Sequence, residues 1–121
     1  YHQKLGEVIV GLNKVMKFDL CVVDGNIVSG VQPYKLGLVM ASRDIVALDV
    51  AAAEIAGLNP KSIEYIMLAN REELGNTAFI PKGMAPEYFK KRYPRRRAEH
   101  KVMELAHKLV KIVGLETRLG L

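Results

Sequence analysis

Residues 38–57 read LVMASRDIVALDVAAAEIAG, and the elements before and after this stretch can be predicted outward from it along the chain. An apolar run long enough for one strand breaks at a Ser-Arg-Asp turn and continues as an almost wholly apolar stretch of helix length. This pattern predicts a buried strand over 36–41 that leads into a buried helix over 44–56. The glycine at position 57 supplies the expected helix stop.

Polar residues at this junction form, together with Asp24, the first candidate site. Ser42 and Asp44 are the two candidates for the N-cap of the helix, and Asp49 is the one carboxylate in its first turns. A carboxylate among apolar neighbours must find a partner or shift its pKa. Asp49 is therefore the strongest ligand-binding candidate of the four.

The pairing of the two strands decides what Asp24 and Asp44 can share. In a parallel pair both carboxylates leave the same sheet edge, where they can bind a divalent cation or a ligand beside a helix N-terminus. In an antiparallel hairpin they lie at opposite ends, and a connection of about a dozen residues allows either arrangement. In the structural alternative, Asp44 caps the helix, Asp24 forms an Asx turn and Asp49 is hydrogen-bonded to a neighbouring loop.

Upstream of this junction, the spacing of apolar residues predicts an amphipathic helix over 5–16, with Asn13 on its polar side. The run over 18–23 predicts a buried strand, and Asp-Gly-Asn at 24–26 is a turn signal that opens a loop reaching residue 35. The apolar side of the helix is expected to face the core and consists of Leu5, Val8, Ile9, Leu12, Val15 and Met16.

Downstream, Asn59-Pro60 is typical of a cap and first helical position, and the helix it starts is expected to end at Leu74-Gly75. A short strand is predicted over 77–80, followed by a surface excursion with one helical turn at 87–91. The last amphipathic helix is expected from the apolar spacing of Val102, Leu105, Ala106, Leu109, Ile112 and Val113.

This order of elements predicts an α/β fold, a small mixed sheet with helices packed on it. We expect a single domain in which residues 1–80 form the core, while the basic excursion and final helix of residues 81–121 pack on that core. Two strands do not make a stable sheet alone, so the chain is expected to be a fragment of a larger α/β domain.

The composition excludes several classes of protein. The 121 residues contain no apolar run near the roughly 20 residues that a membrane span needs, and no charged leader precedes an apolar core, so we expect a cytoplasmic protein without membrane contact. Cys21 is the single cysteine and is expected to be a buried, inert thiol. A disulfide framework, a cysteine zinc site and an iron–sulfur cluster are excluded within this chain.

Positive charge is concentrated in the last third of the sequence. Residues 1–81 hold 7 Lys and Arg against 9 Asp and Glu, whereas residues 82–121 hold 11 against 4. The second candidate site lies there, where Tyr88 and Phe89 precede a cluster of six cations that can neutralise phosphates: Lys90, Lys91, Arg92, Arg95, Arg96 and Arg97. The alternatives are a solvated surface or a dock for an acidic partner, and no nucleic-acid-binding motif accompanies the cluster.

A third candidate site combines two histidines and a glutamate on the last predicted helix. His100, Glu104 and His107 are spaced so that all three can face one way and ligate a metal. Three lysines border that face, which favours the alternative of an exposed helix side with a Glu104–Lys108 pair.

Four blocks of the sequence resemble, in order, the C-terminal half of the family catalogued as domain of unknown function 362. They are FDLCVVDG at 18–25, KLGLVMASRDIVALD at 35–49, AAAEIAGLNP at 51–60 and IEYIMLANREELG at 63–75. The resemblance covers roughly residues 1–76 and implies an α/β fold without an established reaction. Two positions depart from the family pattern: Ile45 stands where proline is usual, and residues 29–33 lack the Gly-x-Gly-Pro segment, which questions a ligand contact by that loop.

Members of that family are often joined to ferredoxin-type domains, so the resemblance implies a ligand- or metal-binding module of an iron–sulfur-associated redox protein. Any cluster would then sit on a separate domain or partner, such as a ferredoxin-like module or an N-terminal half of the same domain. The alternatives are a module that binds nucleic acid or an acidic partner through residues 88–97, and a purely structural half-domain.

Overall fold

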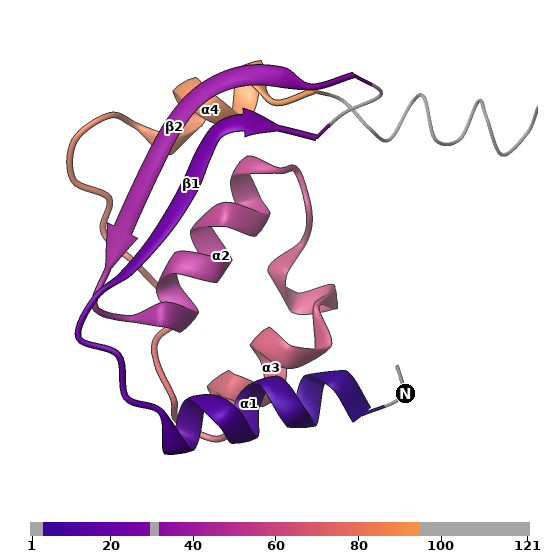
Figure 1. Cartoon of the computed structure of the whole chain (residues 1–121), viewed down its shortest axis with the longest axis vertical. Helices are drawn as coiled ribbons and strands as arrows, with labels where there is room; N and C mark the ends of the chain where they lie inside the picture. Colours follow the sequence, from indigo (N-terminus) through magenta and orange to yellow (C-terminus); the bar gives the residue numbers. More distant parts are fainter. Residues whose placement is uncertain (1–3, 30–31, 95–121) are drawn as a thin grey trace, which may run out of the picture.

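The computed structural model describes residues 4–29 and 32–94, and there the chain forms helices around one hairpin (Figure 1). The α/β class predicted from the sequence is confirmed, with a two-stranded antiparallel sheet in the described part. The elements in chain order are α1 Leu5–Val15, β1 Cys21–Val28, β2 Tyr34–Ser42, α2 Ile45–Ile55, the 3-10 helix η2 Pro60–Ser62, α3 Glu64–Arg71 and α4 Pro86–Arg92.

Helix α2 is the centre of the fold. It lies between the hairpin on one side and the pair α1 and α3 on the other, and α4 packs on β2 and α2 (Figure 1). The predicted burial of this helix is confirmed, because seven of its eleven residues are buried. A helix that is apolar on all sides requires such cover on both faces.

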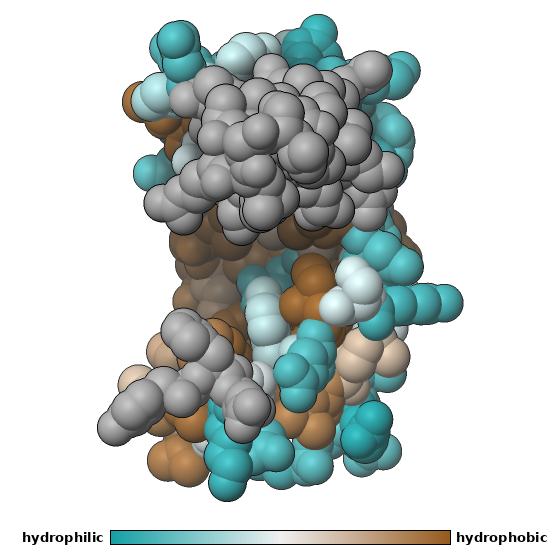
Figure 2. Space-filling model, turned by 90° about the vertical axis from the view of Figure 1, so that its right-hand side faces the viewer, coloured by the Kyte–Doolittle hydropathy of each residue, from teal (hydrophilic) through white to brown (hydrophobic). Residues whose placement is uncertain are grey.

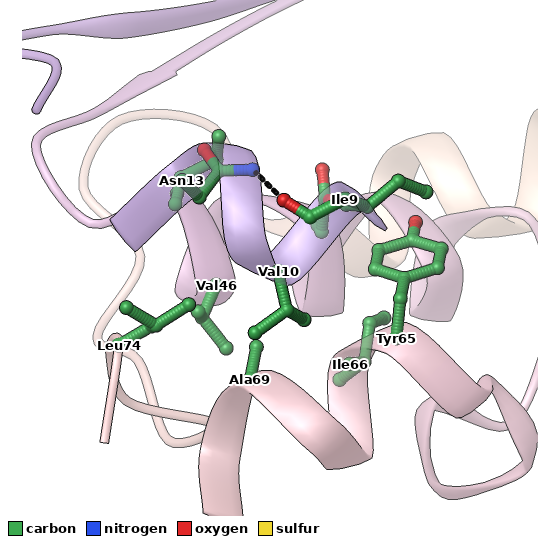
Figure 3. A pocket seen from close by; sticks show the side chains of 10 residues that line it. Ile9, Val10, Asn13, Val46, Tyr65, Ile66, Ala69 and Leu74 are labelled. Carbon is green, nitrogen blue, oxygen red and sulfur yellow. Dashed lines mark hydrogen bonds between the residues drawn. The ribbon is translucent and has the colours of Figure 1, made fainter. Parts of the chain in front are cut away.

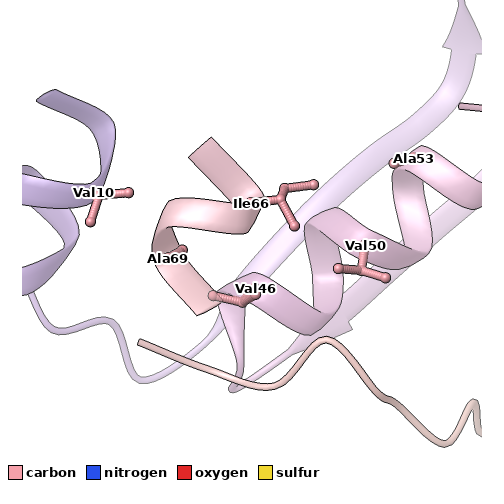
Figure 4. Packing of buried hydrophobic residues seen from close by; sticks show 6 residues of the cluster. All are labelled: Val10, Val46, Val50, Ala53, Ile66 and Ala69. Carbon is pink, nitrogen blue, oxygen red and sulfur yellow. The ribbon is translucent and has the colours of Figure 1, made fainter. Parts of the chain in front are cut away.

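The two faces of α2 join two separate hydrophobic clusters. Toward α1 and α3, Val46 and Val50 pack with Val10, Ala69 and Ile66, whose exposure is 1% (Figure 4). Toward the hairpin, Ile55 packs with residues of β2 and with a buried phenylalanine of α4. The described part of the C-terminal excursion therefore belongs to the same packed unit as the core.

The ends of α2 follow the predicted capping pattern. Of the two candidate caps, Asp44 is the N-cap: its Oδ1 accepts from the Ala47 amide at 3.0 Å, while the Ser42 Oγ accepts from the Asp44 amide at 3.0 Å. At the other end Gly57 has φ of +74°, and the Leu58 amide donates to the Ala53 carbonyl at 2.9 Å. A glycine at this position closes the helix without side-chain strain.

The predicted end of the first strand at Asp-Gly-Asn is wrong, because β1 continues through these residues to Val28. The ladder shifts register between Gly25 and Ile27, and the Asp24 carboxylate accepts from the Asn26 amide at 2.9 Å. The Asp-Gly-Asn sequence thus forms its turn hydrogen bond within an irregular part of the strand. The loop predicted over 24–35 is reduced to the connection between β1 and β2.

The predicted core-facing side of α1 is also wrong. Helix α1 packs on α3 through Gly6 and Val10, with Ile9 and Asn13 half-buried, whereas Leu12 is 56% and Val15 84% exposed. The apolar residues that the spacing placed toward the core, apart from Ile9, instead form an exposed stripe.

Other expectations need smaller corrections. The helix after Asn59 is interrupted: Asn59 caps η2 as predicted, but α3 is a separate helix that ends before Leu74. Residues 77–80 form no strand, and Cys21 is only partly buried. The helical turn at 87–91 is confirmed as part of α4, whereas the helix predicted over 102–113 lies outside the described residues.

Candidate functional site

The hairpin separates two of the four carboxyl and hydroxyl groups that the sequence singles out. Because β1 and β2 pair antiparallel, Cys21 lies opposite Ser42 and Asp24 lies opposite Val39. Asp24 is therefore three strand positions, roughly 10 Å, from the end of β2 that leads to Asp44. A cation shared between Asp24 and Asp44, which a parallel pair would allow, does not fit this arrangement.

Asp44 has a structural role. Besides capping α2, its Oδ2 accepts from the Asn76 backbone amide at 2.8 Å and from the Asn76 side-chain amide at 3.2 Å. Gly75 lies so close that an added Cβ would stand 2.2 Å from the Asp44 Oδ1. We call this group of Asp44, Gly75 and Asn76 the Asp44 clamp; it fastens the chain after α3 to the start of α2.

Asp49 has a different environment. Its half-buried carboxylate, on α2, lies beside the Tyr65 hydroxyl of α3. Burial raises the pKa of Asp49 above its usual value, and the neighbouring Tyr65 hydroxyl opposes part of that rise. The pKa of Tyr65 is also raised, mainly by its own burial and then by the negative charge of Asp49. The direction of the Asp49 pKa shift is the one that burial of a carboxylate produces.

A small cavity of about 30 Å³ lies between α1, α2 and α3 next to this pair. Figure 3 shows Tyr65 rising from α3 with its hydroxyl on the side of α1, near Ile9. The Asn13 side-chain amide donates to the Ile9 carbonyl at 2.8 Å, while its buried Oδ1 has no hydrogen-bond partner in the described part of the chain. The cavity has room for about one water molecule.

A larger cleft of about 300 Å³, which we call the β1/α2 cleft, opens on the other side of Asp49 and Tyr65. Both residues line the cleft as well as the small cavity. Asp24 lines it from β1, Tyr93 lines it from the end of α4, and the remaining lining residues are apolar or glycine. In Figure 2 this side of the molecule shows a hollow at mid-height where apolar residues gather. The Asp24 side chain is exposed and shares the outer face of the hairpin with Val39, its partner on β2. The structure thus brings together Asp49 and Tyr65 at the cleft and leaves the Asp24 carboxylate, Ser42 and Asp44 away from them.

Ser42 borders a second cleft of about 590 Å³, the β2 groove, between β2, α2 and residues 79–86. Lys82 is the one charged residue of its lining, and the Ser42 hydroxyl is already held by the Asp44 amide. The larger of the two clefts therefore has the poorer set of groups for recognising a polar ligand.

The basic candidate site is described only in part. Lys90 and Lys91 are exposed on α4, Phe89 is buried, and the Arg92 guanidinium lies 3.5 Å from the centre of the Tyr88 ring. The aromatic residues expected to stack on bases are thus engaged within the protein. The other three cations, Arg95, Arg96 and Arg97, lie outside the described residues.

The third candidate site, His100, Glu104 and His107, also lies outside the described residues. Within residues 4–29 and 32–94, no group of three or more His, Cys, Asp or Glu side chains is placed to hold a metal ion. In the same part of the chain, no helix combines the length and hydrophobicity needed to cross a membrane.

Comparison with known proteins agrees with the resemblance seen in the sequence over part of its length. The model of one family, described as Domain of unknown function (DUF362), matches residues 1–54. This match confirms the family resemblance for the N-terminal part of the chain. It does not reach residue 76, and it does not support the narrower expectation that the chain corresponds to the C-terminal half of the family. No curated protein and no solved structure matches the chain.

Sequence reasoning missed three residues of this region: Tyr65, Asn13 and Tyr93. Tyr65 stands between Ile63 and Ile66 in the sequence, so the apolar spacing indicates an ordinary core aromatic residue. The signal that could have pointed to Tyr65 is the need of the Asp49 carboxylate for a hydrogen-bond donor, because a tyrosine hydroxyl is a common partner of a half-buried carboxylate.

Proposed function

We propose that this chain is a small-molecule-binding module whose ligand occupies the β1/α2 cleft and is recognised by Asp49. The observation that carries the proposal is the placement of Asp49: a half-buried carboxylate, beside the Tyr65 hydroxyl, on the wall of a mainly apolar cleft. A volume of about 300 Å³ is at the lower end of the range for small-molecule sites.

The chemistry of the lining supports binding of an organic molecule. Apolar walls with few polar groups are typical of sites that bury most of a ligand and orient it through those groups. Here the polar side chains come from two helices, since Asp49 lies on α2 and Tyr65 on α3. A ligand held by both would lie against the apolar wall that the hairpin supplies.

The family resemblance extends the proposal to a redox setting. In this extension the module serves an iron–sulfur-associated protein in the cytoplasm, and the cluster sits on a ferredoxin-like domain or partner. The chain has a single cysteine, so it lacks the thiolates that such a cluster needs.

The test is a nuclear magnetic resonance titration of the full 121-residue chain with benzyl alcohol, a neutral probe with an apolar body and one hydroxyl. We expect the backbone amide signals of Gly25, Ala53 and Leu58, which line the β1/α2 cleft, to shift together. Asp49→Asn should reduce the affinity for the probe. Glu54→Gln, an exposed change on the same helix, should leave it unaltered.

Two outcomes of this titration would contradict the proposal. One is the absence of shifts at the cleft amides. The other is a set of shifts confined to the β2 groove, which Ala51 and Met84 report, because these two residues line that groove and not the β1/α2 cleft.

A second candidate function, binding of nucleic acid or an acidic partner through residues 88–97, has one observation in its favour: Lys90 and Lys91 stand exposed side by side on α4. Exposed neighbouring cations attract polyanions. We place this function second because burial of Phe89 and coverage of Tyr88 by Arg92 leave no free aromatic pair for stacking on bases.

A further inference from the structure

We infer that the β2 groove binds an extended, acidic segment of a partner protein, which adds as a third strand to the free edge of β2. This inference goes beyond the proposed function, since it concerns a different cleft and a different class of ligand. The observation that carries it is the lining of the groove, which includes six consecutive residues of β2, residues 37–42.

A hollow bordered by consecutive strand residues lies along the edge of the strand. Successive side chains of a strand point to opposite faces, so a hollow over one face would be lined by every second residue. Here Leu38 is buried, at 6% exposure, and Val39 is 67% exposed on the opposite face, yet both line the groove. No residue of β1 lines it, so the groove follows the backbone of β2 on the side away from β1.

That edge of β2 carries hydrogen-bonding groups that a further strand can use. β1 pairs with residues 38–42 on the other edge, and an antiparallel ladder uses the N–H and C=O groups of every second residue. The groups of the alternate residues point away from β1. In the part of the chain that the structure describes, no backbone hydrogen bond joins them to another segment. An unpaired edge of this kind is a template for pairing with another chain.

The wall opposite the edge suits apolar side chains. It comes from α2 and from residues 79–86, which run past β2 in Figure 1. Ile80 is 88% and Met84 59% exposed, although both are large and apolar. A third strand would direct every second side chain toward this wall, where a methionine can adapt to partners of different shape.

Charge complementarity indicates the chemistry of the bound segment. Lys82 is the one charged residue of the lining and is exposed, and the formal charge of the whole chain is +5. An acidic side chain of the segment can pair with Lys82, and the overall field favours the approach of an acidic partner. The segment that fits is therefore extended, with alternate apolar residues and an acidic residue among the others.

A second copy of this chain fits the edge less well than an extended segment does. In each copy, residues 79–86 stand across the groove from β2, so two β2 edges would meet only after both of these segments moved. A peptide has no such flanking segment. The volume of about 590 Å³ is within the usual range of binding sites.

The experiment is a nuclear magnetic resonance titration of the full 121-residue chain with a capped hexapeptide of alternating valine and threonine, in which one threonine is replaced by glutamate. We expect the amide signals of residues 37–42 to shift. Every second amide among them should gain protection from hydrogen exchange, as strand addition requires. The same peptide with proline in place of its middle valine should not bind, because proline cannot donate to a strand ladder.

Two variants test the walls of the groove. Lys82→Glu should weaken binding of the glutamate peptide about fivefold and leave binding of the matching glutamine peptide unchanged. Met84→Asp should weaken binding of both peptides. Lys61→Glu, an exposed change outside the groove, is the matched control and should alter neither affinity. Circular dichroism of each variant confirms that it is folded.

Several outcomes would overturn the inference. They are no binding of the glutamate peptide, equal binding of the proline peptide, and shifts confined to the β1/α2 cleft. A free chain that sediments as a dimer and already shows the alternate protection in β2 would assign the edge to a second copy and would also overturn it. The titration with benzyl alcohol tests the proposed function separately, so either proposal can fail while the other stands.

Discussion

The Asp44 clamp gives a stability prediction that can be worked out from distances. In Gly75→Ala the new Cβ would stand 2.2 Å from the Asp44 Oδ1 and 2.9 Å from the Val46 Cβ. Both atoms belong to the start of α2, which packs in the core, so relief requires the chain at residues 75–76 to move away. The Asp44 carboxylate would then lose its hydrogen bonds to Asn76.

The size of the effect follows from the bonds that break. Loss of the N-cap interaction in Asp44→Ala costs about 1 kcal/mol. Loss of the hydrogen bonds from Asn76 to the charged carboxylate adds about 1–2 kcal/mol, toward the low end because the Asn76 side is exposed. We therefore expect Asp44→Ala to lower the free energy of unfolding by about 2–3 kcal/mol. Gly75→Ala should lower it by about 2 kcal/mol, since both changes break the same contacts.

The assay is urea unfolding followed by circular dichroism for both single variants and the double variant. Because the two changes remove shared hydrogen bonds, the double variant should lose about 3 kcal/mol, clearly less than the sum of the single losses. Purely additive losses, or an Asp44→Ala variant within about 0.5 kcal/mol of the wild type, would refute the clamp. Binding of benzyl alcohol should be unchanged in Asp44→Ala, since Asp44 lies outside the β1/α2 cleft.

Three further predictions concern the core, the site and the basic stretch. Ile66→Ala should lower the free energy of unfolding by about 2–5 kcal/mol in the same urea assay, because Ile66 is 1% exposed; a loss below about 1 kcal/mol would contradict its central place in the core. Burial raises the pKa of Asp49 above 3.8, so the folded chain keeps the proton on this carboxyl to higher pH than the unfolded chain. The stability that this proton contributes is present below pH 3.8 and is lost as the pH rises through the pKa of the folded state. The stability of Asp49→Asn relative to wild type should therefore increase from about pH 3 to pH 7, and an equal difference at both pH values would contradict the pKa shift. Finally, if residues 88–97 bind fluorescent single-stranded RNA, the affinity should fall steeply with salt and weaken in a Lys90→Ala, Lys91→Ala variant, and no binding at low salt would end that candidate function.

The elements around α2 could be predicted from sequence because local signals and burial agree there. The apolar run, the Asp44 cap and the stop at Gly57 all indicate the same helix, and the structure has it over Ile45–Ile55. The helix N-terminus after Ser42 follows from the same pattern. Residues 44–56 were also predicted to be buried, because a helix apolar on all sides has no solvent face.

Other features depended on contacts between distant residues, which periodicity does not encode. The spacing in α1 indicated one apolar side, but packing on α3 buries a different side, with Gly6 and Val10. The turn signal at 24–26 produces the Asp24–Asn26 hydrogen bond, but pairing with β2 continues the strand past it. The site itself needed the tertiary structure, since Asp49 and Tyr65 come from different helices.

The most direct test of the central claim locates benzyl alcohol on the wild-type chain through nuclear Overhauser contacts between probe protons and side-chain methyl groups. We predict contacts with Leu58 and Ile63, which line the β1/α2 cleft. Contacts with Leu48 and Met84 of the β2 groove in their place, or no contact with any of the four, would contradict the account.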